Sequence, residues 1–181
     1  VDMDLFIEEV VRAADEVGAA RGTGKRIDIS FDEWNIWYVD RYHDEDEATG
    51  IGNWPIAPRI LEDNYSVLDA VVFGSLMISL LTHADRVTSA SLAQLVNVIA
   101  PIMTEPGGPA WRQTTFFPFA TTARLARGEA IRLQLDVPSY PTARYGDVRL
   151  VDAVATRDAE AGRSALFLVN RSLTDAVTVT V

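Results

Sequence analysis

The sequence predicts an α/β segment followed by an all-β segment. Residues 1–128 alternate helical and strand patterns, with a hydrophobic period near 3.6 in the helices and two in the first strand. From Gly128 onward the pattern changes to short strands separated by turn residues, which is typical of an antiparallel sandwich. We therefore expect two domains, residues 1–128 and residues 129–181.

The composition limits the possible functions. The chain has 181 residues, a hydrophobic content of 48% and a formal net charge of −10. Nucleic acids and anionic membranes attract basic surfaces, and one lysine with scattered arginines supplies none, so we expect neither partner. The sequence has no cysteine, which excludes disulfides and thiolate metal sites. Its acidic first residues show no signal peptide, and we infer a cytoplasmic protein.

The first predicted helix covers residues 4–21. Apolar side chains at four- and three-residue spacing predict its buried face: Phe6, Val10, Ala14 and Val17. Glycines at 18, 22 and 24 end the helix. A parallel strand then begins at residue 27, because Ile27, Ile29 and Phe31 alternate with polar residues.

Residues 39–53 carry a charge run and few apolar side chains, which predicts a solvated loop. Asp44 and Asp46 have the spacing of the first two ligands of a calcium loop. However, Ala48 stands at the next ligand position and no glutamate follows at the twelfth. We therefore expect no metal site, and no other pattern in the chain indicates a cofactor.

The strongest helical pattern covers residues 65–82. Ser66 and Asp69 have the spacing of a capping box, with aspartate in place of glutamate. The apolar run that follows is shorter than the roughly 20 residues needed to cross a bilayer. We therefore expect this helix to pack on a sheet.

Residues 86–98 predict a second strand, with the apolar composition of a parallel strand buried on both faces. Two amides interrupt it, Gln94 and Asn97, and a buried amide needs hydrogen-bond partners. Either neighbouring backbone groups supply these partners, or Gln94 contacts a ligand at the end of the strand. A loop over residues 101–109 and a helix over residues 111–126 are expected next.

The all-β segment is punctuated by a break at residues 137–141 and a turn at residues 158–162. Its predicted strands cover residues 131–135, 148–155, 164–171 and 176–181.

The first strand ends in a carboxylate surrounded by aromatic side chains: Phe31-Asp32-Glu33-Trp34-Asn35-Ile36-Trp37-Tyr38. Aromatic faces there would pack on sugar C–H groups. This segment resembles the nucleophile segment of the family 51 glycoside hydrolases, the retaining α-L-arabinofuranosidases. Further blocks are similar to that family in the same order, so that the resemblance covers most of residues 25–120: residues 57–63, 83–87, 92–102 and 108–111.

The resemblance implies a fold. Residues 1–128 would be the C-terminal portion of a (β/α)8 TIM barrel, contributing strands 7 and 8, and residues 129–181 would be part of a jelly-roll-like β-sandwich domain. A barrel of this kind carries its chemistry at the C-terminal ends of its strands. The resemblance also implies a homo-oligomer.

The resemblance further implies an activity and its residues. The family releases terminal non-reducing α-L-arabinofuranosyl residues from oligo- and polysaccharides by double displacement. Glu33 would be the nucleophile, Trp37 an aromatic wall of the arabinose subsite, and Gln94 a ligand of a sugar hydroxyl. The side chains of Trp34, Asn35 and Tyr38 are expected to pack or to support the site.

Half of the catalytic machinery is missing from this sequence. A retaining mechanism needs a second carboxyl group, the acid/base, about 5 Å from the nucleophile. In the resembled family it belongs to an Asn-Glu pair on barrel strand four, and this sequence contains no such pair. We therefore expect the N-terminal barrel portion, in the same or another chain, as a partner. Glu62 and Glu105 are candidate substitutes within the chain, but we expect Glu62 to cap or pair locally and Glu105 to lie on the rim.

Two other functions remain open. One is a different retaining glycosidase that shares a nucleophile on strand seven of the barrel. The other is a non-catalytic carbohydrate-binding or structural piece, in which Glu33 only orients a sugar.

Overall fold

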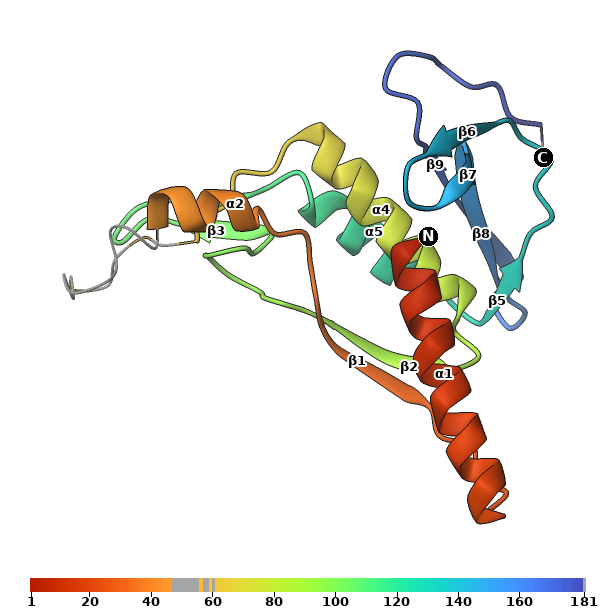
Figure 1. Cartoon of the computed structure of the whole chain (residues 1–181). Coiled ribbons are helices and arrows are strands. Elements are labelled where there is room, and N and C mark those ends of the chain that lie inside the picture. Colours follow the sequence, from red (N-terminus) through yellow and green to blue (C-terminus); the bar gives the residue numbers. More distant parts are fainter. Residues whose placement is uncertain (47–55, 57–58, 60, 181) are drawn as a thin grey trace.

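The computed structural model describes residues 1–46, 56, 59 and 61–180. Within them, a part built from helices and two parallel strands is followed by an antiparallel part, as predicted (Figure 1). Helix α4 (Val67–Thr82) lies between the two parts. Strands β1 (Ile29–Trp34) and β2 (Val87–Leu92) are on one side of α4, and the strands after residue 128 are on the other.

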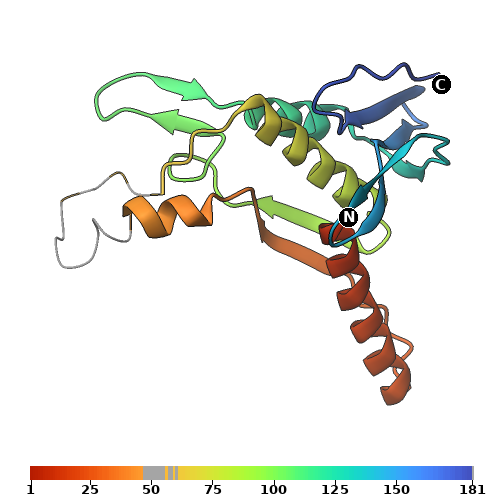
Figure 2. The same cartoon turned by 45° about the horizontal axis from the view of Figure 1, so that its top comes forward.

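Strands β1 and β2 pair in parallel, with Ile29 opposite Val87 and Trp34 opposite Leu92. Figure 2 shows them side by side beneath α4. Because the strands are parallel, both carboxyl ends lie at the same edge of the pair. The core lies between these strands and their helices, and its buried members are Ile7, Trp34, Phe73, Leu80 and Val87.

Helix α1 (Asp2–Arg21) has the predicted extent and ends at Gly22 in a left-handed conformation. The prediction of its buried face is wrong. Ile7 is the buried residue of this helix, with Met3 and Val11 beside it against the core. Phe6 and Val17, from the predicted stripe, are 56% and 51% exposed. Both rows have helical spacing, and only the packing of the helix selects between them.

The capping box of α4 is confirmed. Ser66 Oγ accepts from the Asp69 N–H at 3.4 Å, and Asp69 Oδ2 accepts from the Ser66 N–H at 2.5 Å. Among the described residues, no helix combines the length and apolarity that a bilayer crossing requires. Instead α4 packs closely on the antiparallel sheet, since a Cβ at Gly74 would lie 3.2 Å from Val169 Cγ2.

The prediction of a loop over residues 39–53 is wrong for residues 39–46, which the structure describes. Residues 39–46 form a short helix α2 (Val39–Arg41) and a π-helical turn η1 (Tyr42–Asp46). Tertiary contacts hold this turn, because Arg41 Nη1 donates to the Glu62 carbonyl at 2.8 Å. The remainder of the predicted loop, residues 47–53, lies outside the described residues.

The segment after β2 also departs from the prediction. The strand ends at Leu92 rather than near residue 98. Strands β3 (Ile102–Thr104) and β4 (Ala110–Arg112) then form a hairpin where a loop and the start of a helix were predicted. Helix α5 (Phe116–Leu125) therefore begins later than expected. Strands of three residues are too short to show a period in sequence.

The antiparallel part contains a three-stranded sheet and a hairpin. The sheet has the order β5 (Glu129–Arg132), β8 (Val151–Asp158), β9 (Arg163–Asn170), and the hairpin joins β6 (Ser139–Thr142) to β7 (Gly146–Arg149). The predicted break at residues 137–141 is thus partly strand. Pro141 is tolerated there because a two-stranded hairpin leaves unpaired positions. The predicted last strand is wrong for residues 176–180, and residue 181 lies outside the described chain.

Candidate active site at the ends of the parallel strands

The end of β1 does not follow simple alternation. Ile29 and Phe31 pack against the core beside Trp34. From Phe31 to Trp34 β1 advances three residues, whereas its partner advances only from Ala90 to Leu92. Strand β1 therefore carries one extra residue, as in a β-bulge, at Asp32 and Glu33.

This register shift determines where Glu33 points. Strict alternation would place Glu33 on the same face as Ile29 and Phe31, which pack against the core. With the extra residue, Trp34 takes that face instead, and Asp32 and Glu33 are both exposed. Glu33 lines a cavity of 280 Å³ between α1 and β1, together with Phe6, Val10 and Phe31.

Asn35 joins the end of β1 to the segment after β2. Its Nδ2 donates to the carbonyls of Ala93 and Ile99, both at 2.6 Å. Its Oδ1 accepts from the Ile36 N–H at 2.8 Å. All three polar bonds of this half-buried amide therefore go to backbone groups at the same edge of the strand pair.

Gln94 lies in that segment after β2 and is exposed. Its Nε2 donates to the carbonyls of Val96 at 3.1 Å and Asn97 at 3.3 Å. Nearby backbone thus supplies the partners of its nitrogen, which was one of the two interpretations. Its carbonyl oxygen accepts no hydrogen bond within the described chain and is available to a ligand.

Asn97 is held by the hairpin that follows. Its Nδ2 donates to Thr104 Oγ1 at 2.9 Å, and its Oδ1 accepts from the Thr104 N–H at 2.8 Å. Local hydrogen bonding therefore accounts for this second amide.

Trp37 follows shortly after Glu33 in the chain and is 48% exposed. Its ring lies 5.8 Å from that of Tyr42 in η1. The next residue, Tyr38, fixes this segment, because its N–H donates to Asp63 Oδ2 at 2.9 Å and its hydroxyl to Asp69 Oδ1 at 2.5 Å.

These hydrogen bonds shift the acidities of the groups that they join. The bond to Asp69 is the main cause that raises the pKa of Tyr38 to about 12. Burial works to raise the pKa of Asp69, but hydrogen bonds from Tyr38 and Ser66 outweigh it and leave that pKa below its ordinary value. Asp69 is therefore a buried carboxylate that serves to hold structure.

A buried polar group beneath the site escaped the sequence analysis. Gln113 accepts from the Tyr65 N–H at 3.0 Å and donates to the carbonyls of Asp63 at 3.0 Å and Ala100 at 2.9 Å. Tyr65 Oη lies 2.6 Å from the Ile36 carbonyl. Neither residue stands out in the sequence, because Gln113 lies between Arg112 and Thr114 and Tyr65 lies between Asn64 and Ser66.

Both candidate substitutes for the acid/base pair with Arg59, and the pairing of Glu62 is local, as predicted. Glu62 Oε2 lies 3.3 Å from Arg59 Nη1, and Glu105 Oε2 lies 2.7 Å from Arg59 Nη2. Among the residues that the structure describes, no group of three or more His, Asp or Glu side chains is arranged to hold a metal ion.

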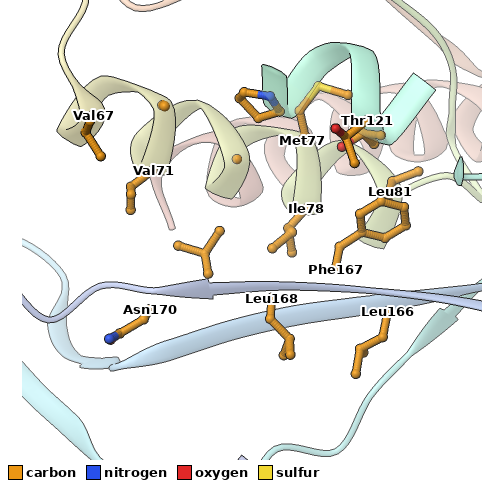
Figure 3. Close-up of a pocket in the computed structure, with 15 residues that line it drawn as sticks. Val67, Val71, Met77, Ile78, Leu81, Thr121, Leu166, Phe167, Leu168 and Asn170 are labelled. Atoms are coloured by element: carbon orange, nitrogen blue, oxygen red, sulfur yellow. The ribbon is translucent and has the colours of Figure 1, made fainter. Parts of the chain in front are cut away.

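A larger cavity of 490 Å³ lies between α4, α5 and β9 and has no ionisable side chain in its lining. Figure 3 shows Ile78 and Leu81 projecting from α4 toward β9, from which Phe167 projects back. Its apolar walls fit packing between helix and sheet, and they offer few polar groups to a sugar.

Comparison with known proteins identifies the family of the chain. Residues 32–181 match the family described as the α-L-arabinofuranosidase C-terminal domain. An intracellular exo-α-(1→5)-L-arabinofuranosidase of Streptomyces lividans is 59% identical over 98% of this chain, which spans 26% of that relative. An exo-α-(1→6)-L-arabinofuranosidase of Bifidobacterium longum is 56% identical over 96% of this chain, which spans 33% of it.

Solved structures give the same result. A family 51 α-L-arabinofuranosidase from Bifidobacterium longum superposes with a TM-score of 0.88 and 51% identity, covering 94% of this chain and 34% of that one. A family 51 enzyme from Thermotoga petrophila, 21% identical, shares the fold with a TM-score of 0.74 over 98% of this chain. The chain thus spans between a quarter and about a third of the relatives it matches. From this family match and these identities, the chain belongs to the α-L-arabinofuranosidase C-terminal domain family of the family 51 glycoside hydrolases.

Proposed function

We propose that this chain is the nucleophile-bearing part of a retaining exo-α-L-arabinofuranosidase. In this proposal β1 and β2 are strands 7 and 8 of a (β/α)8 barrel, and residues 129–181 belong to a jelly-roll-like domain. Relatives that the chain matches are named exo-α-L-arabinofuranosidases, and several are named intracellular, which supports a cytoplasmic enzyme.

The observation that carries the proposal is the exposure of Glu33 at the end of β1. The register shift turns this carboxylate away from the core while Phe31 and Trp34 stay packed. A carboxylate that only stabilised the fold would instead be expected to have a partner. No hydrogen bond or ion pair of Glu33 is found among the described residues. An exposed carboxylate at the carboxyl end of a parallel strand suits a nucleophile.

Glu33 would act by double displacement. Its carboxylate attacks the anomeric carbon of a terminal arabinofuranosyl group, and the bond from that carbon to the leaving oxygen breaks as the acid/base protonates this oxygen. The resulting glycosyl ester is hydrolysed when water, deprotonated by the same acid/base, attacks the anomeric carbon and frees Glu33. The acid/base would come from the N-terminal barrel portion.

Trp37 and Gln94 would bind the sugar. The half-exposed indole of Trp37 offers a flat apolar face to sugar C–H groups. The carbonyl oxygen of Gln94 would accept from a sugar hydroxyl, since its nitrogen is already engaged with backbone. Both side chains follow strands whose carboxyl ends share one edge with Glu33.

Chemical rescue tests the role of Glu33 in the complete enzyme. Glu33→Gly should lower kcat for nitrophenyl α-L-arabinofuranoside at least about 1,000-fold. Added azide should restore turnover and give an arabinofuranosyl azide of inverted anomeric configuration, because azide then attacks from the face that the carboxylate has left.

Two results would count against the proposal. An azide product of retained configuration would make Glu33 the acid/base, and unchanged turnover would remove it from the mechanism. Glu160→Gln, on the exposed turn between β8 and β9, is the control for loss of a carboxylate elsewhere. A panel of nitrophenyl pyranosides and furanosides tests the sugar, with preference for another glycoside contradicting the substrate assignment.

A further inference from the structure

We infer that Asn35 is a positioning residue that holds Gln94 in place relative to Glu33. This inference rests on the proposed function, and it assigns a role to a side chain that would not itself touch the sugar.

The two acceptors of Asn35 bracket the segment that carries Gln94. Ala93, the residue immediately before Gln94, receives one N–H of the amide, and Ile99 receives the other, both at 2.6 Å. The Ala93 N–H in turn donates to the Trp34 carbonyl at 3.2 Å. One side chain therefore fastens both ends of residues 93–99 to the end of β1, two positions from Glu33.

The bracketed segment does not have an intrinsically favoured conformation. Asn97 and Val98 have φ values of 61° and 59°, in the left-handed region that residues other than glycine seldom adopt. A β-branched residue such as Val98 is especially disfavoured there, so contacts from outside must maintain the conformation. Asn97 is held by Thr104, and the ends of the segment are held by Asn35.

Only an amide serves all of these bonds at once. Its nitrogen supplies two N–H groups for two carbonyls, and its oxygen accepts from the Ile36 N–H at 2.8 Å. Aspartate has nearly the same shape but no donor, and its charge would face two carbonyl oxygens. Asn35→Asp therefore keeps the volume of the side chain and removes both hydrogen bonds that Asn35 donates to the segment.

A displaced segment would displace Gln94. Its nitrogen bonds to the carbonyls of Val96 and Asn97 inside the same segment, so Gln94 moves with that backbone. The carbonyl oxygen that would meet a sugar hydroxyl then shifts relative to Glu33. A displacement of about 1 Å in such a contact lowers the rate by about 100-fold.

The test is a double-mutant cycle in the complete enzyme, with Asn35→Asp, Gln94→Ala and the double variant. Asn35→Asp should lower kcat/KM for nitrophenyl α-L-arabinofuranoside by about 100-fold. In the Gln94→Ala background the same change should have an effect of less than about threefold, because the group being positioned is absent. The single variants are also compared on substrates that each lack one sugar hydroxyl. The substrate that lacks the hydroxyl bound by Gln94 should show the smallest loss of kcat/KM in both variants.

Asn170→Asp is the matched control. Asn170 donates to the Asp175 carbonyl at 2.8 Å at the exposed end of β9, and this change should leave kcat/KM as it is. Additive losses from Asn35→Asp and Gln94→Ala, or an unchanged kcat/KM in Asn35→Asp, would overturn the inference.

Folding and the identity of the nucleophile are followed separately. If Asn35→Asp does not fold, the cycle is repeated with Asn35→Ala, which adds no charge. Failure of both variants to fold would show that Asn35 has a purely structural role and would overturn the inference. A covalent arabinose-mimic label, located by peptide mapping in the parent enzyme, checks Glu33. Label on another residue refutes the proposed function, whereas label on Glu33 with an additive cycle refutes only the positioning role.

Discussion

Tyr38 makes two hydrogen bonds through different groups, and both go to carboxylates. Its backbone N–H reaches Asp63 and its hydroxyl reaches Asp69, which also caps α4 through Ser66. The segment that carries Trp37 is thereby tied to the start of a core helix. At the scale of single residues, polar side chains outside the candidate site decide where Trp37 lies.

Tyr38→Phe should lower the free energy of unfolding by about 1 kcal/mol near neutral pH, because it removes a hydrogen bond to a charged, buried carboxylate. The pKa of Tyr38 is raised to about 12 in the folded protein. The stabilisation from this hydrogen bond is therefore fully present below pH 10, and it is lost as the pH rises to about 12. The pKa of Asp69 is lowered in the folded protein. The same stabilisation is therefore present above about pH 4, and it is lost as the pH falls through the pKa that Asp69 has in the folded protein.

Urea unfolding of the complete enzyme across this pH range measures the difference between the two proteins. Tyr140→Phe is the control, since the hydroxyl of Tyr140 makes no hydrogen bond within the described chain. A difference between the Tyr38 variant and the parent that stays constant from pH 3 to pH 12 would show that the bond to Asp69 carries no net stability.

At the scale of elements, α4 is the contact surface for both halves of the chain. Phe73 and Leu80 pack in the core with β1 and β2. Gly74 approaches β9 closely enough that a Cβ would lie 3.2 Å from Val169 Cγ2. A glycine inside a helix costs about 1 kcal/mol relative to alanine, and close approach to the sheet is its physical reason here.

Gly74→Leu should push β9 away from α4 and lower the free energy of unfolding by about 1–3 kcal/mol. Thermal and urea unfolding of the complete enzyme measure this change. Gly18→Ala is the matched comparison in α1, where the added Cβ would meet only Lys25 O at an ordinary 3.7 Å. That change should stabilise by up to about 1 kcal/mol. Equal effects of both changes would show that the α4–β9 contact is unimportant.

At the scale of the whole molecule, the described chain leaves apolar surface open on the side of α1. Leu5, Phe6 and Val17 are each more than half exposed, and β1 pairs with β2 alone among the described strands. Open strand edges and apolar patches promote association with other chains. The proposed N-terminal barrel portion would cover both features.

The 181-residue chain produced alone should therefore self-associate and bind a hydrophobic dye, and it should not hydrolyse arabinofuranosides. Light scattering, dye fluorescence and a nitrophenyl arabinofuranoside assay measure these three properties. Phe6→Lys should reduce the association by placing a charge on the open face of α1. A monomeric chain that does not bind the dye would contradict this account of the surface, and hydrolysis by the chain alone would contradict an acid/base outside it.

Much of the fold could be predicted from local patterns. The extent of α1, the capping box of α4 and the parallel strands follow from period, caps and apolar runs, which act within a few residues. The hairpin of β3 and β4 could not be predicted, because pairs such as Met103 and Trp111 stabilise one another only across a turn. The helical turns at residues 39–46 were missed for a similar reason, since the contact of Arg41 with Glu62 is long-range.

The sequence by itself determined the family resemblance, the helices α1 and α4 with the two parallel strands, and the identity of the candidate nucleophile, since these depend on which residues follow one another. Only the tertiary structure decided that Glu33 leaves the face on which Ile29 and Phe31 are packed, and that Asn35 reaches Ala93 and Ile99. A register shift exists only between paired strands, and a hydrogen bond between distant segments exists only after they pack. Neither feature therefore produces a local pattern in the amino-acid sequence from which it could be predicted.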